Sequence, residues 1–190
     1  MTTLHTDPER MHAEILAFLH RYQPDSAEAA TKEATIRFAA TTPHPTDRGT
    51  ESGHLTCSGI IVTPDGGRVL LTLHRQLGIW LQTGGHCEPG ETLLAAALRE
   101  ALEESGLAEL SMRTTPVDID IHHVPCAGRT LPHFDVRFAA VHHGPPDAVR
   151  ISPESSRLEW FPPTGLPEGT LPGTRRGILA ALRSIARSDA

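Results

Sequence analysis

The chain has 190 residues, and its 17 Lys and Arg against 23 Asp and Glu give a formal net charge of −6. A chain of this length accommodates one domain with an additional segment and can bury a hydrophobic core. Its 38% hydrophobic and 21% charged residues are typical of a soluble globular protein. No run of 18 apolar residues predicts a transmembrane helix. The acidic balance argues against non-specific nucleic-acid binding, which needs a basic surface, so we expect neither a nucleic-acid nor a membrane partner.

The N-terminus and the cysteines favour a cytoplasmic protein. The N-terminal residues include acidic side chains and histidines where a secretory signal would have a basic stretch followed by an apolar core. Cys57, Cys87 and Cys126 cannot all pair and form no CxxC motif, in agreement with a reducing compartment. The count of 12 histidines is high and suggests a metal.

Residues 1–48 are expected to form an N-terminal helical extension and linker. Asp7-Pro8 is a helix-start signal, and apolar residues then recur at helical spacing. An alanine-rich second helix is predicted from Asp25 to Ala40. The run from Thr41 to Gly53 is rich in proline, threonine and glycine and predicts a loop. Residues 49–190 then form the main domain, and the extension packs on it.

Strands and helices are mixed in the main domain. Short β-branched and leucine-rich runs predict strands at His54–Thr63, Arg68–His74, Val117–Val124, His133–Val141 and Leu158–Phe161. Helices are predicted at residues 91–105, between Gly90 and Gly106, and at Gly173–Arg187. This mixture indicates a compact α/β sandwich.

The segment with the strongest functional signal is GGHCEPGETLLAAALREALEESGL, residues 84–107. Its helix places Glu100, Glu103 and Glu104 at i, i+3 and i+4, on one face and within about one turn. Carboxylates this close repel one another unless a cation lies among them, and hard oxygen ligands suit Mg²⁺ or Mn²⁺. The alternative for such a charge run is a solvated acidic helix face.

The spacing of this segment resembles a family signature. Gly85, Glu91 and the run Arg99-Glu100-Ala101-Leu102-Glu103-Glu104-Ser105-Gly106-Leu107 match the box of the Nudix hydrolases, G-x5-E-x7-R-E-U-x-E-E-x-G-U. Ala101, at an aliphatic position, is a mild departure that affects packing more than chemistry. A match over so many positions at fixed spacing makes the solvated acidic face the weaker interpretation.

The resemblance implies a Nudix-type α/β/α sandwich with a mixed sheet. It also implies divalent-metal-dependent hydrolysis of a phosphoanhydride bond in a nucleoside diphosphate linked to another moiety. Glu100, Glu103 and Glu104 would bind Mg²⁺ or Mn²⁺, and the Gly84 carbonyl would add a ligand. Glu103, Glu104 or Glu154 would accept a proton from the attacking water.

Further roles follow from the same resemblance. Arg99 and Glu91 would interact to orient the loop and the helix. Gly106 would end the helix in a left-handed conformation. Many family members have an acidic residue in the loop before a strand that bears a Trp, and Glu154 precedes Trp160 in this way. An exposed loop glutamate without a role is the alternative for Glu154.

Alternation along two predicted strands gathers polar residues on one sheet surface. The residues concerned are Asp118, Asp120, His122, His133, Asp135 and Arg137. They form either a solvent-exposed polar face or a substrate pocket, in which Arg137 contacts phosphate and the His and Asp side chains bind polar groups or a second metal.

The remaining candidates are weaker. His86 and Cys87 lie inside the loop, where His86 could contact substrate or metal, but we expect proximity without an essential role. The surface is the expected place of His5, His12, His20 and His44. Trp80 is expected to pack in the core or to order the loop.

Two other functions stay open. Isoprenoid diphosphate isomerases share this fold and use a Cys, a His-rich metal site and glutamates, which His86-Cys87 would fit, although they generally depart from the strict box. The other is a catalytically silent Nudix module that senses a ligand, although no DNA-binding domain is indicated. No pattern names the substrate, beyond a small nucleotide-type diphosphate. The choice between a monomer and a homodimer is also open.

Overall fold

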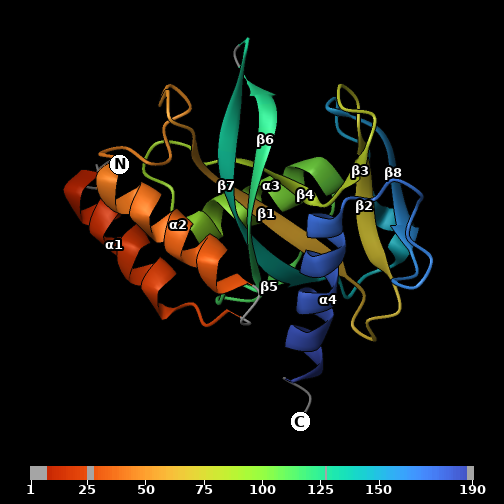
Figure 1. Cartoon of the computed structure of the whole chain (residues 1–190). Helices are drawn as coiled ribbons and strands as arrows, with labels where there is room; N and C mark the ends of the chain where they lie inside the picture. Colours follow the sequence, from red (N-terminus) through yellow and green to blue (C-terminus); the bar gives the residue numbers. More distant parts are fainter. Residues whose placement is uncertain (1–7, 25–27, 127, 188–190) are drawn as a thin grey trace, which may run out of the picture.

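A computed structural model describes residues 8–24, 28–126 and 128–187 (Figure 1). The expected helix starts at Asp7 and Asp25, and the expected surface position of His5, lie outside these residues. Within them, no helix is both long and apolar enough to cross a membrane.

The centre of the fold is an eight-stranded mixed sheet. Its strands are β1 (His54–Val62), β2 (Val69–His74), β3 (Trp80–Leu81), β4 (Thr83–His86), β5 (Ser111–Met112), β6 (Asp118–Cys126), β7 (Arg129–Val141) and β8 (Ser155–Phe161). Strand β1 pairs in parallel with β7 and antiparallel with β2 and β4. The pairs β2–β3, β2–β8, β5–β7 and β6–β7 are antiparallel. The long β6–β7 hairpin projects past the helices (Figure 1).

Helices cover both faces of this sheet. They are α1 (Pro8–Arg21), α2 (Ala29–Thr41), α3 (Leu93–Ser105) and α4 (Pro172–Ala186), with a short 3-10 turn, η2 (Pro146–Ala148), before β8. A Cβ built on Gly59 would lie 2.8 Å from the Cβ of Ala101 in α3, and one on Gly177 of α4 would lie 3.0 Å from Ile60. Neighbouring residues of a strand point to opposite faces. Helices α3 and α4 therefore lie on opposite sides of β1, and the expected α/β/α sandwich is confirmed.

Ala101, the mild departure from the family box, has a packing reason. The side chain is 0% exposed and lies directly over Gly59. A larger aliphatic residue would overfill this contact, so the pair of small residues allows α3 to approach β1 closely.

Helix α3 begins two residues later than predicted and ends as predicted. The side chain of Thr92 accepts a hydrogen bond from the backbone N–H of Ala95 and caps the helix. Gly106 ends it with φ +65°, and a Cβ there would lie 2.5 Å from the Cβ of Arg150. The left-handed position and the crowding both require glycine.

The N-terminal helices share the hydrophobic core. Ile15 and Leu19 of α1 belong to the same buried cluster as Phe138 of β7 and residues of α3. Phe38 of α2 stacks on Phe134 of β7 with ring centroids 4.0 Å apart. Helices α1 and α2 therefore pack on the face of the sheet that α3 covers.

Shortening a core side chain of α1 tests this packing. Leu19→Ala should lower the free energy of unfolding by about 2–5 kcal/mol, because Leu19 is 0% exposed. Urea denaturation measures the change. The neighbouring His20 is exposed, so His20→Ala should change stability by less than about 0.5 kcal/mol. Equal effects of the two substitutions would contradict the shared core.

Candidate active site

Arg99 ties the loop after β4 to helix α3. Its Nε and Nη2 donate to the two carboxylate oxygens of Glu91, both at 2.9 Å, and Nη2 also donates to the backbone carbonyl of His86 at 2.8 Å. Its Nη1 donates to Glu100 at 2.9 Å and to Glu103 at 3.2 Å. Hydrogen bonds from Arg99 hold the pKa of Glu91 below its usual value. Such a bidentate pair is both strong and geometrically specific, so the loop and the helix keep one relative position.

The glycines of β4 bring the backbone against the glutamates of α3. A Cβ on Gly85 would lie 2.5 Å from the carboxylate carbon of Glu100. The backbone N–H of Gly84 donates to Glu104 at 3.3 Å. A Cβ on Gly84 would lie 2.4 Å from the hydroxyl of Ser58. At Gly84 the backbone of β1 leaves no room for a Cβ, whereas at Gly85 a side chain would displace the carboxylate of Glu100 from its place against β4.

The glutamates are held close together in a partly buried setting. Burial raises the pKa of Glu104 to about 8; the N–H of Gly84 opposes this rise, and the charges of Glu100, Glu154 and Glu103 add to it. Burial likewise raises the pKa of Glu100 against the opposing effect of Arg99, with further contributions from Glu103 and Glu154. The acidic groups therefore interact although Glu154 comes from the loop before β8 and is exposed. Partly buried like charges of this kind fit a divalent cation, which would relieve their repulsion.

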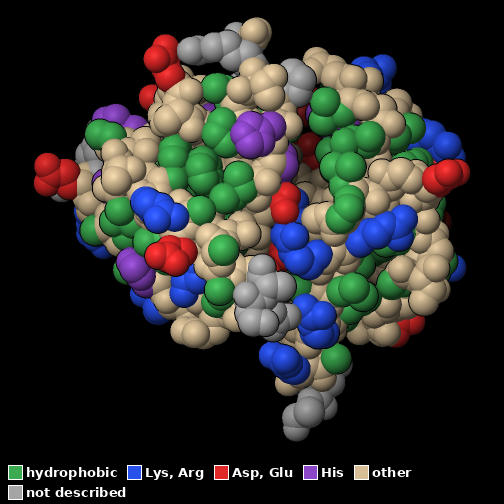
Figure 2. Space-filling view, viewed as in Figure 1, with side chains coloured by type: hydrophobic (Ala, Val, Ile, Leu, Met, Phe, Trp, Pro, Cys, Tyr) green, Lys and Arg blue, Asp and Glu red, His purple; other side chains and the backbone are tan. Residues whose placement is uncertain are grey.

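This region opens to solvent through a hollow. Figure 2 shows one face of the molecule hollowed between the β6–β7 hairpin and the side formed by β2, β3 and β8. Histidine side chains lie at its edge, and acidic side chains lie deeper, where β4 and α3 are placed in Figure 1. A substrate can thus reach the acidic groups from this face.

The sequence match to a known family identifies the family of this chain. The family model described as NUDIX domain matches residues 53–182. The chain belongs to the Nudix hydrolase family. The solved structure of a MutT Nudix hydrolase from Burkholderia pseudomallei has a TM-score of 0.52 at 25% identity, over 68% of this chain and 98% of that one. The E. coli dihydroneopterin triphosphate pyrophosphohydrolase has a TM-score of 0.58 at 19% identity, over 68% of this chain and 95% of that one, and is similar in fold.

Curated relatives have diverse names. An RNA pyrophosphohydrolase of Roseobacter denitrificans is 31% identical over 144 residues, which cover 66% of this chain and 88% of the relative. A Bacillus subtilis protein named putative 8-oxo-dGTP diphosphatase is 29% identical over 120 residues, 63% of this chain and 74% of the relative. An octanoyltransferase of Myxococcus xanthus is 38% identical over 121 residues, 60% of this chain but only 32% of the relative. The Nudix chain therefore spans about a third of that last protein.

The polar face of β6 and β7 is mostly a buried ion-pair network. Arg137 donates to Asp135 at 2.8 Å, to Asp118 at 2.9 Å, to Asp120 at 3.0 Å and to the carbonyl of Gly173 at 2.7 Å. Relative exposures are 0% for Asp118 and 2% for both Asp135 and Arg137. The expectation of a solvent-exposed face is therefore wrong for these residues, because α4 covers them. Arg137 is buried and makes these four hydrogen bonds within the protein, so we do not retain it as a phosphate contact.

Sequence reasoning missed several members of this network. Arg176 of α4 binds Asp118 at 2.7 Å and Asp120 at 2.8 Å. Its pKa is raised because the two aspartates outweigh the effect of burial. Ser58 of β1 donates to Asp135 at 2.9 Å. Arg176 lies in a stretch with no motif, so only the tertiary packing of α4 identifies it.

The histidines of the same face behave differently. His86 of β4 and His133 of β7 lie together with His54 of β1, which sequence reasoning missed. Alternation along β1 was an available signal, because it places His54 on the same face as Ser58. His122 is 5.8 Å from His133 between ring centroids and pairs with Asp120 at 3.1 Å.

The remaining histidines, Trp80 and the cysteines have mixed environments. His20 and His44 are exposed, whereas His12 is half-buried and contacts the carbonyl of Ala39 at 2.7 Å. Trp80 packs edge-on against Phe161 with ring centroids 4.9 Å apart. The Cys87 sulfur is buried against the Cys57 sulfur at 3.4 Å. Nothing is described for the side chain of Cys126.

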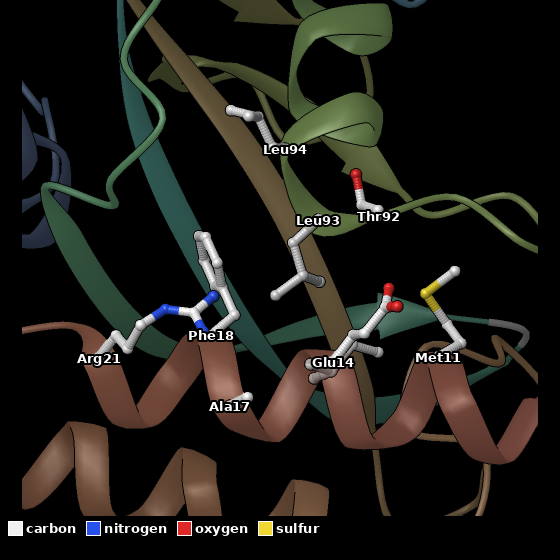
Figure 3. Close-up of a pocket in the computed structure, with 9 residues that line it drawn as sticks. Met11, Glu14, Ala17, Phe18, Arg21, Thr92, Leu93 and Leu94 are labelled. Atoms are coloured by element: carbon white, nitrogen blue, oxygen red, sulfur yellow. The ribbon is translucent and has the colours of Figure 1, made fainter.

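A pocket lies away from the carboxylates. It has a volume of about 340 Å³ and is formed between α1 and the start of α3. Figure 3 shows Met11, Phe18, Leu93 and Leu94 lining it together with Glu14. Its lining is mainly apolar, and the box glutamates are not part of it, so we do not assign the chemistry there.

The raised pKa of Glu104 has a measurable consequence. The folded metal-free chain holds this proton up to about pH 8, whereas an unfolded glutamate loses it near pH 4.3. Between these values the folded state binds more protons, so stability decreases as the pH rises. In chelator, the Tm of the wild type should therefore fall by several degrees relative to that of Glu104→Gln from about pH 5 to about pH 8. Differential scanning calorimetry measures both curves.

The exposed Glu109 provides the control, since Glu109→Gln should follow the wild type at every pH. Parallel curves for the wild type and Glu104→Gln would contradict the raised pKa.

Arg137 is expected to stabilise the folded state. Arg137→Met should lower the free energy of unfolding by about 3–5 kcal/mol, because it leaves buried carboxylates without a counter-charge. Arg157, whose side chain is 59% exposed and pairs with Glu159, provides the matched control Arg157→Met. This control should cost less than about 1 kcal/mol. A stable Arg137→Met variant with a raised KM would instead indicate a phosphate contact.

Proposed function

We propose that this Nudix protein hydrolyses a phosphoanhydride bond in a nucleoside diphosphate linked to another moiety, and that the reaction depends on Mg²⁺ or Mn²⁺. The proposal rests on family membership and on one structural observation. Arg99 holds the loop and α3 together so that Glu100 and Glu104 face the glycine backbone of β4. This arrangement concentrates negative charge at a solvent-accessible hollow.

The donor set suits hard cations. Glu100, Glu103 and Glu104 would hold them, with the Gly84 carbonyl as an additional ligand. Divalent cations in such a site supply charge neutralisation on the diphosphate and acidify water. The oxygen ligands of the set favour Mg²⁺ or Mn²⁺ over softer metals.

The side chains of the site divide the work. Arg99 and Glu91 position the loop and do not need to touch the substrate. Glu103, which is exposed, and Glu104 are candidates for the group that takes the proton from water. Glu154 is the third candidate, because its charge acts on both Glu100 and Glu104 while its side chain stays exposed.

The substrate contacts follow from exposure. His122, whose side chain is 34% exposed, and the half-buried His86 are proposed to contact polar groups of the substrate. His133 and Asp135 are buried and are not retained as direct contacts. The substrate is proposed to be a small molecule, since the chain has a net charge of −6. We further propose a cytoplasmic location.

Neutralising single carboxylates tests the proposed chemistry. Glu103→Gln and Glu104→Gln should each lower metal-dependent turnover by at least about a hundredfold, because each removes a charged ligand or the proton acceptor. Stopped-time assays of phosphate-containing products, with and without chelator, measure the loss. Glu109→Gln, on the exposed segment after α3, should keep nearly full activity. Near-normal rates in both site variants would refute the assignment.

A substrate screen separates this function from the alternatives. It should contain nucleoside triphosphates, nucleotide sugars, dinucleotides, a 5′-triphosphorylated RNA oligonucleotide and isopentenyl diphosphate, each with Mg²⁺ and with Mn²⁺. Release of phosphate-containing products from a small nucleotide supports the proposal. Turnover of the RNA alone would assign a different substrate class. Rearrangement of isopentenyl diphosphate without phosphate release would indicate an isomerase, and tight nucleotide binding without turnover would indicate a sensing module.

A further inference from the structure

Three histidines from three paired strands meet on the sheet face opposite α3. His54 of β1 is the register partner of His133 in the parallel β7, and His86 of β4 is the partner of Thr56, two residues after His54. All three side chains therefore share one face. Ring centroids are 4.4 Å apart for His54–His133, 4.8 Å for His54–His86 and 5.3 Å for His86–His133. One ring nitrogen from each lies within 4.8 Å of the other two.

The ring nitrogens in this cluster are buried without hydrogen-bond partners. This holds for both nitrogens of His54 and for Nε2 of His86 and of His133. His54 is 0% exposed and His133 is 8% exposed. Buried polar atoms are normally hydrogen-bonded, and exceptions indicate an additional ligand, ion or water. All four unpartnered atoms belong to the three rings that each bring one ligand nitrogen within 4.8 Å of the others, so this cluster is an exception of that kind.

The protonation state of the rings suits metal binding. Burial lowers the pKa of His133 to about 3 and also lowers the pKa of His54, and at His133 the mutual repulsion of the protonated rings adds to the effect. Neutral imidazole, which has a free lone pair, is the form that binds metals. The rings therefore need not lose protons at neutral pH to become ligands.

We propose that His54, His86 and His133 form a transition-metal site of the Zn²⁺ type, separate from the carboxylate site of the Nudix box. Imidazole nitrogens suit Zn²⁺ and its neighbours, whereas Mg²⁺ prefers oxygen. With Zn–N bonds of about 2.0–2.1 Å, tetrahedral geometry places ligand nitrogens about 3.3 Å apart. The cluster has to contract by about 1.5 Å at most to reach that spacing. Three protein ligands leave a fourth position open for water or a substrate group.

Strand β4 lies between the carboxylate site and the histidine cluster and contributes to both. The backbone N–H of Gly84 binds Glu104, and the His86 carbonyl accepts a hydrogen bond from Arg99. The His86 side chain extends to the opposite face, toward His54 and His133. A metal on the histidines would thus fix the strand whose backbone contacts the box glutamates.

Nearby charges partly balance at this site. Arg48, which is exposed, acts on His54 and His86 in the sense that opposes a cation. Asp47 acts on His54 in the opposite sense, and Asp135 does so on His133. Asp135 is itself paired with Arg137, so Asp47 is the carboxylate that offsets the guanidinium of Arg48, and the side chain of Arg48 is exposed.

Cobalt spectroscopy tests the site directly. The full chain is stripped with chelator, supplied with excess Mg²⁺ to occupy the carboxylates, and titrated with Co²⁺. Tetrahedral nitrogen ligation should produce intense visible d–d absorption that saturates at one Co²⁺ per chain and is reversed by Zn²⁺. His86→Gln and His133→Gln should each weaken this binding by at least about a hundredfold, because even loss of groups that merely orient ligands costs about 10–100-fold.

Two controls make the result specific. His143→Gln, at an exposed histidine, and Glu104→Gln, in the carboxylate site, should both keep the cobalt spectrum. Circular dichroism in chelator verifies that each variant is folded, and a Zn²⁺-induced rise in the Tm of the wild type, absent in His86→Gln, gives an independent measure. The proposal is overturned if the wild type shows no tetrahedral absorption. It is equally overturned if binding survives in both site variants or is lost in Glu104→Gln instead. None of these outcomes depends on hydrolytic activity, so this proposal and the proposed function can fail separately.

Discussion

The candidate active site depends on the hydrogen bonds of Arg99. One guanidinium binds a loop carboxylate, a strand carbonyl and two helix carboxylates. It thereby holds β4, the following loop and α3 in fixed relative positions without the help of a metal or substrate. Without this group, Glu100 and Glu104 would lie close together on α3 with no compensating positive charge. The hydrogen bonds that join α3 to the loop and to β4 would also be lost. The guanidinium is planar and always charged, which a lysine could not reproduce at a bidentate site.

Two further arginines play a similar structural role on the other face of the sheet. Arg137 and Arg176 together neutralise Asp118 and Asp120, and the carbonyl of Gly173 joins α4 to the group. Burial opposes ionisation of Asp120, but the hydrogen bond from His122 and the charges of the two arginines keep its pKa low. An intact buried ion pair adds little net stability, but loss of one partner is costly because it leaves the other charge buried and uncompensated. Their position beneath α4 explains why polar strand residues occupy an interior face.

The sequence predicted the end of α3 at Gly106 and the contact between Glu91 and Arg99, because that information is local. Gly106, Arg99 and Glu91 act within a segment in which spacing determines position, and the structure places them as the family pattern implies. The long strands were also predicted. Strands β3, β4 and β5 are too short to show the alternation of polar and apolar residues that predicts a strand. They exist because β2, β1 and β7 offer paired edges.

The sequence alone could not decide whether the polar face of β6 and β7 is exposed or buried. Alternation correctly put Asp118 and Arg137 on one face, but exposed and buried polar faces have the same period. The difference is made by Arg176, a residue 39 positions beyond Arg137 that supplies the missing charge. The same lack of long-range information hid His54, whose importance arises only from its pairing with β4 and β7.

The two faces of β4 thus offer chemically different ligand sets within one short strand. Toward α3 the backbone of Gly84 and Gly85 meets carboxylate oxygens, which suit hard cations. On the other side His86 presents an imidazole to two others, which suits a softer metal. Both sites use the same strand of four residues. A ligand that displaces β4 at one site therefore also moves the backbone at the other site. Occupancy of the histidine cluster would therefore stabilise the backbone position on which the glutamate site depends, through strand geometry and without direct contact between the two metals.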